Sequence, residues 1–121
     1  MVARSETEKI VREQPENEKA WSVLGLIDAH LGQKDKAVQE GRNACNILPI
    51  EKDAVDGVTL ISNLAKIYAI TGEKDLALQQ LEIATKLPGG PTYGELRLAR
   101  EWDLIRGDPG FAKIIASLAP K

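Results

Sequence analysis

The sequence predicts an all-α fold, and three of its features support this prediction. Apolar residues recur about every 3.6 residues in several segments, which is the period of an amphipathic helix. No segment alternates apolar and polar residues over the length of a strand. A nine-residue segment recurs later in the chain, and internal repeats of this kind are typical of helical arrays.

The repeated segment is LGQKDKAVQ at residues 31–39, and it returns as TGEKDLALQ at residues 71–79. Gly, Lys, Asp, Ala and Gln stand at matching places with an offset of 40 residues. Leu24 with Leu64 and Ala44 with Ala84 extend the match at the same offset. Because both copies keep the same internal spacing, the sequence predicts two copies of one structural unit.

The first copy resembles the tetratricopeptide repeat (TPR), whose pattern is W-x2-L-G-x2-Y, then A-x3-F, then P. The residues that carry this resemblance in the first copy are Trp21, Leu24, Gly25, Gly32, Ala37, Ala44 and Pro49. In the second copy they are Leu64, Ala65, Tyr68, Gly72, Ala77 and Ala84. The first copy departs from the pattern at Asp28 and Gly41, where the family has Tyr and Phe, and Ile61 replaces the Trp of the second.

The resemblance implies a TPR-like α-α superhelix, in which each unit is an antiparallel pair of helices, A and B, and units stack on one another. Small residues such as Gly25, Ala37, Ala65 and Ala77 would let the two backbones of a pair approach closely. A repeat of about 34 residues is usual. The offset of 40 therefore predicts an insertion at residues 51–57 that lengthens helix A of the second unit.

On this spacing the chain is one TPR-like domain over residues 1–121. It comprises a B helix of a preceding repeat (1–15), two repeats (18–51 and 58–91) and a C-terminal capping segment (92–121). A Ser-x-x-Glu capping box at Ser5 and Glu8 predicts the start of the first helix. Asn17 is expected to cap the second helix, and the run Pro88-Gly89-Gly90-Pro91 ends the fifth.

The last segment carries a helix signal and a second resemblance. Asp108-Pro109 predicts a helix start, after which Phe111, Ile114, Ile115 and Leu118 form an amphipathic stripe that would cover the open end of a solenoid. Residues 93–96 and 102–111 resemble the C-terminal end of large bacterial TPR proteins, which reads W-D-P-L-R-x-D-P-R-F. That resemblance implies a bacterial source, and a chain that is the C-terminal piece of a longer signalling or regulatory protein.

Composition argues against several classes of function. With 16 basic and 18 acidic residues the net charge is −2, which does not favour nucleic-acid binding. No apolar stretch approaches the roughly 20 residues of a membrane span, and residues 1–14 are charged without the apolar core of a signal peptide. The single Cys45 agrees with a reducing compartment, so a cytoplasmic location is expected.

Catalytic and cofactor chemistry is not expected either. His30 is the only histidine, and Asp28 lies two residues away on another face of the same helix. Cys45 lies among apolar residues with no cation to lower the pKa of its thiol. Gly89-Gly90 follows a helix and lacks the Lys of a phosphate loop, so it is interpreted as a linker. We expect a non-enzyme with no metal and no cofactor.

We expect instead a protein–protein interaction scaffold, with an oligomerisation or regulatory segment of a signalling enzyme or transcription regulator as the alternative. The resemblance places seven residues on a concave groove that would bind a protein or peptide, namely Ser22, Leu26, Ala29, His30, Ser62, Lys66 and Ala69. Only Asn63 and Lys66 match the polar residues with which some TPR proteins hold a peptide carboxylate. Val2, Ile10 and Val11 suggest an apolar edge for weak self-association through the first helix.

Overall fold

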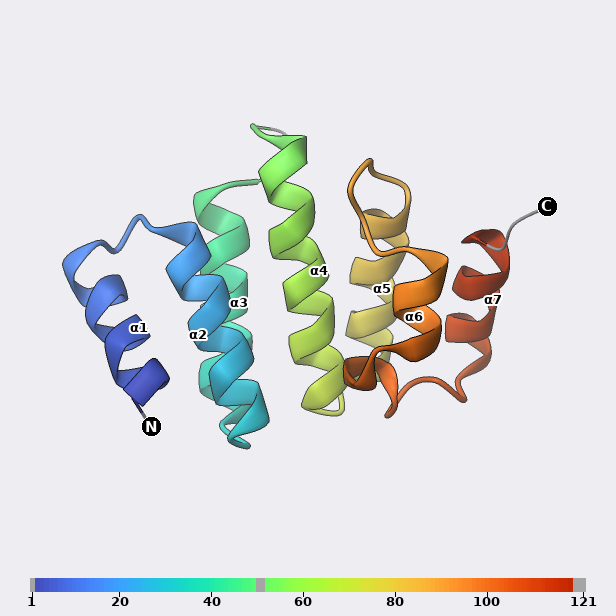
Figure 1. The fold of residues 1–121 in the computed structure, drawn as a ribbon, viewed down its shortest axis with the longest axis horizontal. Coiled ribbons are helices and arrows are strands. Elements are labelled where there is room, and N and C mark those ends of the chain that lie inside the picture. The colour runs from blue at the N-terminus through green and yellow to red at the C-terminus, as the bar shows by residue number, and fades with distance from the viewer. Residues whose placement is uncertain (1, 50–51, 119–121) are drawn as a thin grey trace.

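The protein is described by a computed structural model that covers residues 2–49 and 52–118. These residues form seven α-helices and one short 3-10 helix, and no strand occurs within the described ranges (Figure 1). The prediction of an all-α fold is therefore confirmed. In chain order the elements are α1 (Val2–Glu13), α2 (Glu18–His30), α3 (Lys34–Ile47), α4 (Ala54–Ile70), α5 (Lys74–Thr85), α6 (Tyr93–Leu98), η1 (Arg100–Trp102) and α7 (Pro109–Leu118).

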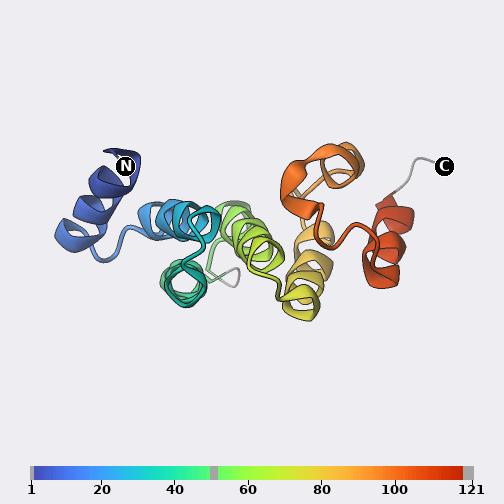
Figure 2. The ribbon, with the colours of Figure 1, turned by 90° about the horizontal axis from the view of Figure 1, so that it is seen from below.

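The helices lie side by side in a row that runs from α1 at one end to α7 at the other (Figure 1). The most extensive contacts join α2 to α3 and α4 to α5, so these are two helical pairs. Helix α4 also packs against both helices of the first pair. Figure 2 shows α1, α2 and α6 along one edge of the row and α3 and α5 along the other. The row therefore has two long faces, built from different helices.

The turns inside the two pairs have nearly the same geometry. Gly32 and Gly72 adopt positive φ angles of 79° and 89°. Beyond each glycine, a backbone N–H returns to the last turn of the helix, from Gln33 to the Asp28 oxygen and from Glu73 to the Tyr68 oxygen, both at 2.8 Å. Glycine suits this helix ending because it has no Cβ to clash at positive φ. The repeated sequence thus makes a repeated turn.

Helices α2 and α3 approach each other closely at Gly25. A Cβ atom on Gly25 would lie 3.1 Å from the Ala37 oxygen and 3.1 Å from the Gly41 nitrogen, which are backbone atoms of α3. At Gly41, where the TPR pattern has Phe, Cδ1 of Ile67 and Cδ1 of Leu64 would lie 2.8 and 2.9 Å from such an atom. The departure from the pattern has a physical reason, since α4 supplies the large side chains that fill this space.

Most residues that define the repeat lie in the core. The buried ones are Leu24, Gly25, Ala37, Ala44, Leu64, Ala65, Tyr68, Ala77 and Ala84. Trp21 and Pro49 are half-buried, and the indole N–H of Trp21 donates to the Pro15 oxygen at 2.8 Å. The small residues therefore mark helix contacts, as expected from their spacing.

Helix α4 is longer than α2, with 17 residues against 13. Its additional residues come before the part that matches α2, which agrees with the expected insertion. Asp53 caps the helix, because its Oδ1 accepts hydrogen bonds from the N–H groups of Val55 and Asp56, both at 3.1 Å. Residue 51, within the expected insertion, lies outside the described residues.

The predicted start of the first helix is wrong. Helix α1 begins at Val2, so Ser5 lies inside it and does not cap it. Glu8 instead accepts hydrogen bonds from Arg4, at 3.0 Å, and from Arg12. Charge-assisted bonds to arginines four residues away on either side are stronger partners than a backbone N–H. In contrast, Asn17 caps α2 as predicted, accepting from the Ala20 N–H at 3.0 Å.

The last segment closes the row at the α5 end. Its large side chains join those of the second pair in one core, in which the Trp102 and Phe111 ring centroids lie 6.3 Å apart. Phe111 and Ile114 of the predicted stripe are buried, and Ile115 and Leu118 pack against the same core. Asp108 caps α7 as predicted, accepting from the Gly110 N–H at 2.8 Å.

Arg106 holds the short helix α6 in place. Its guanidinium donates to three backbone oxygens near the end of α6, those of Leu96 at 3.0 Å, of Ala99 at 2.6 Å, and of Arg97. It also bonds Asp103 at 3.0 Å. Because the last carbonyls of a helix have no partner within it, Arg106 satisfies groups that so short a helix leaves free.

We expect Gly25→Ala to destabilise the protein by about 1–3 kcal/mol, because the added methyl group would overpack the contact of α2 with α3. Intrinsic helix propensity alone would predict the opposite, since helices prefer Ala to Gly. Gly94→Ala is the matched control, since no atom outside its own helix lies within 4 Å of a Cβ there. It should be neutral or stabilising by up to about 1 kcal/mol. Urea unfolding measures both, and equal effects of the two changes would contradict the packing.

Candidate protein-interaction surfaces

One face of the row, the inner face, is formed by α2 and α4 and carries two pockets. The first, of about 390 Å³, is lined by Glu18, Lys19, Ser22, Val23, Asp56, Thr59, Leu60 and Asn63. The second, of about 330 Å³, is lined by His30, Ile70, Arg100 and Leu104. His30 lies three helical turns after Lys19, and Ile70 two turns after Asn63, so both pockets open on the same side of each helix.

The structure brings residues of the two helical pairs together in the first pocket. The side-chain amide of Asn63 donates to the Ser22 hydroxyl at 2.8 Å, across 41 positions of sequence. This bond fixes the orientation of the Asn63 amide at the pocket wall. Val23 is 46% exposed beside it. The pocket thus combines a held polar group with an accessible apolar one.

The seven residues assigned to a groove occupy different environments. Ser22, Ala29 and Ala69 are buried, because α2 and α4 use them to pack on neighbouring helices, and this leaves them almost no surface for a ligand. Leu26, Ser62 and Lys66 are half-buried, and the Ser62 hydroxyl donates to the Val58 oxygen at 2.8 Å. His30 is exposed and lines the second pocket. Ser22 still belongs to the wall of the first pocket, and Val23, Thr59 and Leu104, which were not predicted, line the pockets as well.

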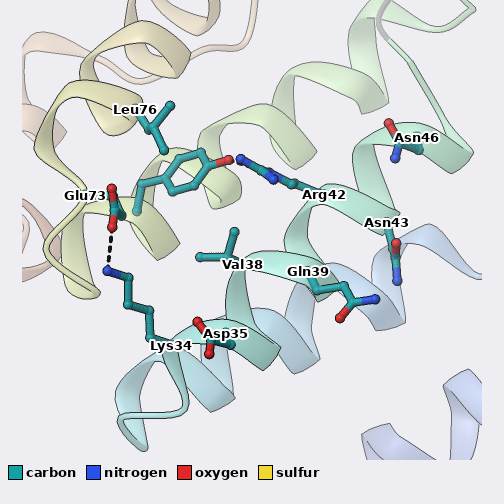
Figure 3. Close-up of a pocket in the computed structure, with 10 residues that line it drawn as sticks. Lys34, Asp35, Val38, Gln39, Arg42, Asn43, Asn46, Glu73 and Leu76 are labelled. Atoms are coloured by element: carbon teal, nitrogen blue, oxygen red, sulfur yellow. Dashed lines mark hydrogen bonds and ion pairs between the residues drawn. The ribbon is translucent and has the colours of Figure 1, made fainter.

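A larger pocket, the outer pocket, opens between α3 and the start of α5 (Figure 3). It measures about 550 Å³ and is lined by Lys34, Asp35, Val38, Gln39, Arg42, Asn43, Asn46, Tyr68, Glu73 and Leu76. Arg42 donates from Nε to the Tyr68 hydroxyl at 2.8 Å, and its guanidinium carbon lies 5.8 Å from the centroid of the Tyr68 ring. Lys34 forms an ion pair with Glu73, which connects α3 to the N-cap of α5.

The contact of Arg42 with Tyr68 has a counterpart one unit earlier. Asp28 occupies in α2 the position that Tyr68 occupies in α4, at the offset of 40. Asp28 accepts from Arg4 of α1, with Nε 2.6 Å from Oδ1 and Nη2 3.3 Å from Oδ2. In both cases an arginine of the preceding helix reaches a buried acceptor. The sequence analysis missed both contacts, although two polar residues at one repeated core position were a signal for them.

Glu40 of α3 completes a buried acidic pair with Asp28. Burial alone would raise the pKa of Asp28, but hydrogen bonds with Arg4 and Glu40 outweigh it and hold that pKa below its ordinary value. The pKa of Glu40 is raised to about 8, first by burial and then by the hydrogen bond and charge of Asp28, against the opposing charges of Arg4 and Lys36. Oε1 of Glu40 is also buried, and no described residue donates a hydrogen bond to it. Both conditions favour the protonated form of Glu40 over its carboxylate.

The single thiol belongs to the core. Cys45 is half-buried and packs beside Val58, Ile61 and Ala84. Burial raises the pKa of its thiol to about 11, so the thiol stays protonated near neutral pH and is a poor nucleophile. Within the described ranges no cluster of three or more His, Cys, Asp or Glu side chains could hold a metal ion. None of the described helices is long and apolar enough to cross a bilayer.

The apolar edge predicted for the first helix is only partly exposed. Val11 is buried against Ala20 and Leu24 of α2, so it is unavailable to a partner and its assignment to the edge is wrong. Ile10 is 38% exposed. The side chain of Val2 lies outside the described part of the chain. Helix α1 thus uses Val11 to dock on its own neighbour.

Glu40→Gln should flatten the pH dependence of stability between pH 4.5 and about 8. Because the folded pKa of Glu40, about 8, exceeds its ordinary 4.5, its contribution is full below pH 4.5 and is lost as the pH rises to about 8. Gln cannot ionise, and its amide can still donate to Asp28. Asp28 acts at the acidic end of the pH range, because its folded pKa is lowered. Its contribution to stability is present above its ordinary pKa of 3.8 and is lost as the pH falls below that value.

Urea unfolding at several pH values measures this effect as the difference between parent and variant. The parent should lose stability relative to Glu40→Gln as the pH rises. Glu82→Gln, on the exposed side of α5, is the matched control and should leave the slope unchanged. Parallel curves for the parent and Glu40→Gln would show that Glu40 is ionised throughout the range.

Comparison of the chain with protein-family models, with curated proteins and with solved structures finds no match. The features of the molecule that bear on its function are therefore the repeated units, the two faces of the row and the side chains that line their pockets.

Proposed function

We propose that this chain is a TPR-like, non-catalytic scaffold whose inner face binds a protein or peptide partner. The observation that carries the proposal is the stacking of two helical pairs that share the Gly32 and Gly72 turn, with α4 packed against both α2 and α3. Stacked repeats of this kind build extended surfaces for partners. A TPR-like superhelix accounts for the spacing of the small residues and for this arrangement together.

The contents of the inner face support a binding role. Val23 and Leu104 are 46% and 59% exposed, at opposite ends of the face, and each lines a pocket with polar neighbours. Accessible apolar side chains surrounded by polar ones are typical of surfaces that contact proteins. The polar groups present at this face suit recognition of a peptide more than catalysis. His30 shares its pocket with Ile70, Arg100 and Leu104, and no carboxylate lines that pocket among the described residues.

Helix α1 makes one contact that resembles a contact between the two pairs, although it lies along the edge of α2 and not along that of α3 and α5 (Figure 2). Arg4 of α1 reaches Asp28 as Arg42 of α3 reaches Tyr68. The alternative, an oligomerisation or regulatory segment that joins through α1, has less support. Val11 is already covered by α2, which leaves Ile10 as the exposed apolar residue of the predicted edge within the described part of α1.

The test is loss of partner binding through the inner face. Partners captured on the immobilised chain would be identified by mass spectrometry, purified, and measured again by titration calorimetry. The double variant Val23→Glu, Leu104→Glu should raise the Kd of an inner-face partner at least about tenfold, because it puts charge into two apolar contacts. Ile83→Glu is the matched control, since Ile83 is 41% exposed on α5 and lines neither inner-face pocket.

The proposal fails if every purified partner binds the double variant as tightly as the parent. Light scattering on the free chain addresses the alternative. A dimer at low micromolar concentration that Ile10→Glu dissociates would favour oligomerisation over partner binding.

A further inference from the structure

We propose that the outer pocket is a second binding site, which takes a short extended peptide segment carrying a side-chain carboxylate. This site lies between α3 and α5 (Figure 3), and these helices run along the edge of the row opposite α2 (Figure 2). It goes beyond the proposed function, because it depends on different residues and predicts a chemically defined ligand.

First, Arg42 is oriented at the pocket by a buried hydrogen-bond partner and has no anionic partner among the described residues. Tyr68 is only 2% exposed, and its hydroxyl accepts from Nε of Arg42 at 2.8 Å. This bond holds the guanidinium at the pocket wall by Nε and leaves the edge between its two terminal amino groups outside the bond. Arg42 itself is exposed, and no carboxylate of the described chain bonds to it. Such a free edge matches the two oxygens of a carboxylate.

The second argument is that the charge of the pocket suits a single negative charge. Lys34 is neutralised by its ion pair with Glu73. Asp35 adds another carboxylate to the wall, about two helical turns before Arg42. Outside the Lys34–Glu73 pair the pocket then holds one cation, Arg42, and one carboxylate, Asp35, which match a phosphate group with about −1.5 to −2 charges near pH 7 less well than a single negative charge. A carboxylate would need only Arg42.

The third argument is the row of amide side chains along α3. Gln39, Asn43 and Asn46 stand four and three residues apart, which places them on one side of the helix (Figure 3). At 1.5 Å per residue this row is about 10 Å long. An extended peptide at about 3.3 Å per residue would place roughly three residues along it. Amide side chains can both donate to and accept from a peptide backbone.

The floor of the pocket adds an apolar requirement. Val38 of α3 and Leu76 of α5 both belong to its lining. An apolar residue next to the acidic one would therefore fit between α3 and α5. The expected ligand is a segment in which an aliphatic residue adjoins Asp or Glu.

Most of these residues belong to one unit only. At the offset of 40, Gln79 repeats Gln39, but Glu82 stands for Arg42, Ile83 for Asn43 and Lys86 for Asn46. The corresponding groove between α5 and α7 therefore lacks the arginine and two of the three amides, and its cations are Lys86 and Lys113. Helix packing does not demand the polar set on α3, because the other pair folds the same way without it.

The test is a titration of the full chain, followed by two-dimensional NMR, with a blocked tetrapeptide that contains adjacent Leu and Glu. Its matched probe has Gln in place of Glu, and a third probe has phosphoserine there. The Glu peptide should shift the Arg42 Nε–H signal and the side-chain amides of Gln39 and Asn43, with saturation in the millimolar range or below. The Gln peptide should bind about tenfold more weakly, since it loses the charge-assisted bond.

Variants of the chain separate this site from others. Arg42→Ala should abolish the shifts. Tyr68→Phe should weaken binding several-fold while the fold is kept, since it removes only the group that orients Arg42. Lys113→Ala, in the groove between α5 and α7, should change nothing. Equal binding of the Glu and Gln peptides, tighter binding of the phosphoserine peptide, or shifts that survive Arg42→Ala would each overturn the proposal, as would absence of binding at about 10 mM peptide.

Discussion

The contact of α2 with α3 at Gly25 is the constraint on which the arrangement of the row depends. Backbone atoms of Ala37 and Gly41 come so near that no side chain fits between the helices. The space on the far side of Gly41 then has to be filled from elsewhere, and Leu64 and Ile67 of α4 fill it. Helix α4 therefore packs against both helices of the first pair. Its direction determines where α5, and with it the last segment, can pack.

The two pairs share their turns and their small core residues, but they differ on their surfaces. Equivalent glycines end α2 and α4 with positive φ, because that helix ending has a strict backbone requirement. No such requirement applies to the outward positions of α3 and α5, where Arg42 and Glu82 stand for one another. This division is what a repeat scaffold permits, since stability comes from the interfaces and recognition from the residues that the interfaces leave free.

Local features of the fold were predictable from the sequence, and contacts between distant residues were not. The glycine turns, the Asn17 and Asp108 caps and the stripe of Phe111 depend on residues within one or two helical turns. The Arg4 contact with Asp28 spans 24 positions and required knowledge of how α1 docks. The groove residues show the same limit. The sequence indicated on which face of the helix Ala29 and Ala69 lie, but it did not indicate which neighbouring helix would cover that face. The capping box predicted at Ser5 was wrong because Glu8 bonds to Arg4 and Arg12 along the helix and not to a backbone N–H at its start.

Different interactions stabilise the two ends of the row. At the α7 end, Trp102, Phe111 and Ile105 are buried together in an apolar core, which responds little to pH or salt. At the α1 end, a small apolar contact of Val11 is joined by three ionisable groups, Arg4, Asp28 and Glu40. An ion pair that is partly exposed weakens with salt, and the raised pKa of Glu40 makes the contact depend on pH. Opening should therefore begin at α1, which packs on α2, and because α2 also lines the first pocket of the inner face, conditions that loosen this end would also affect that pocket.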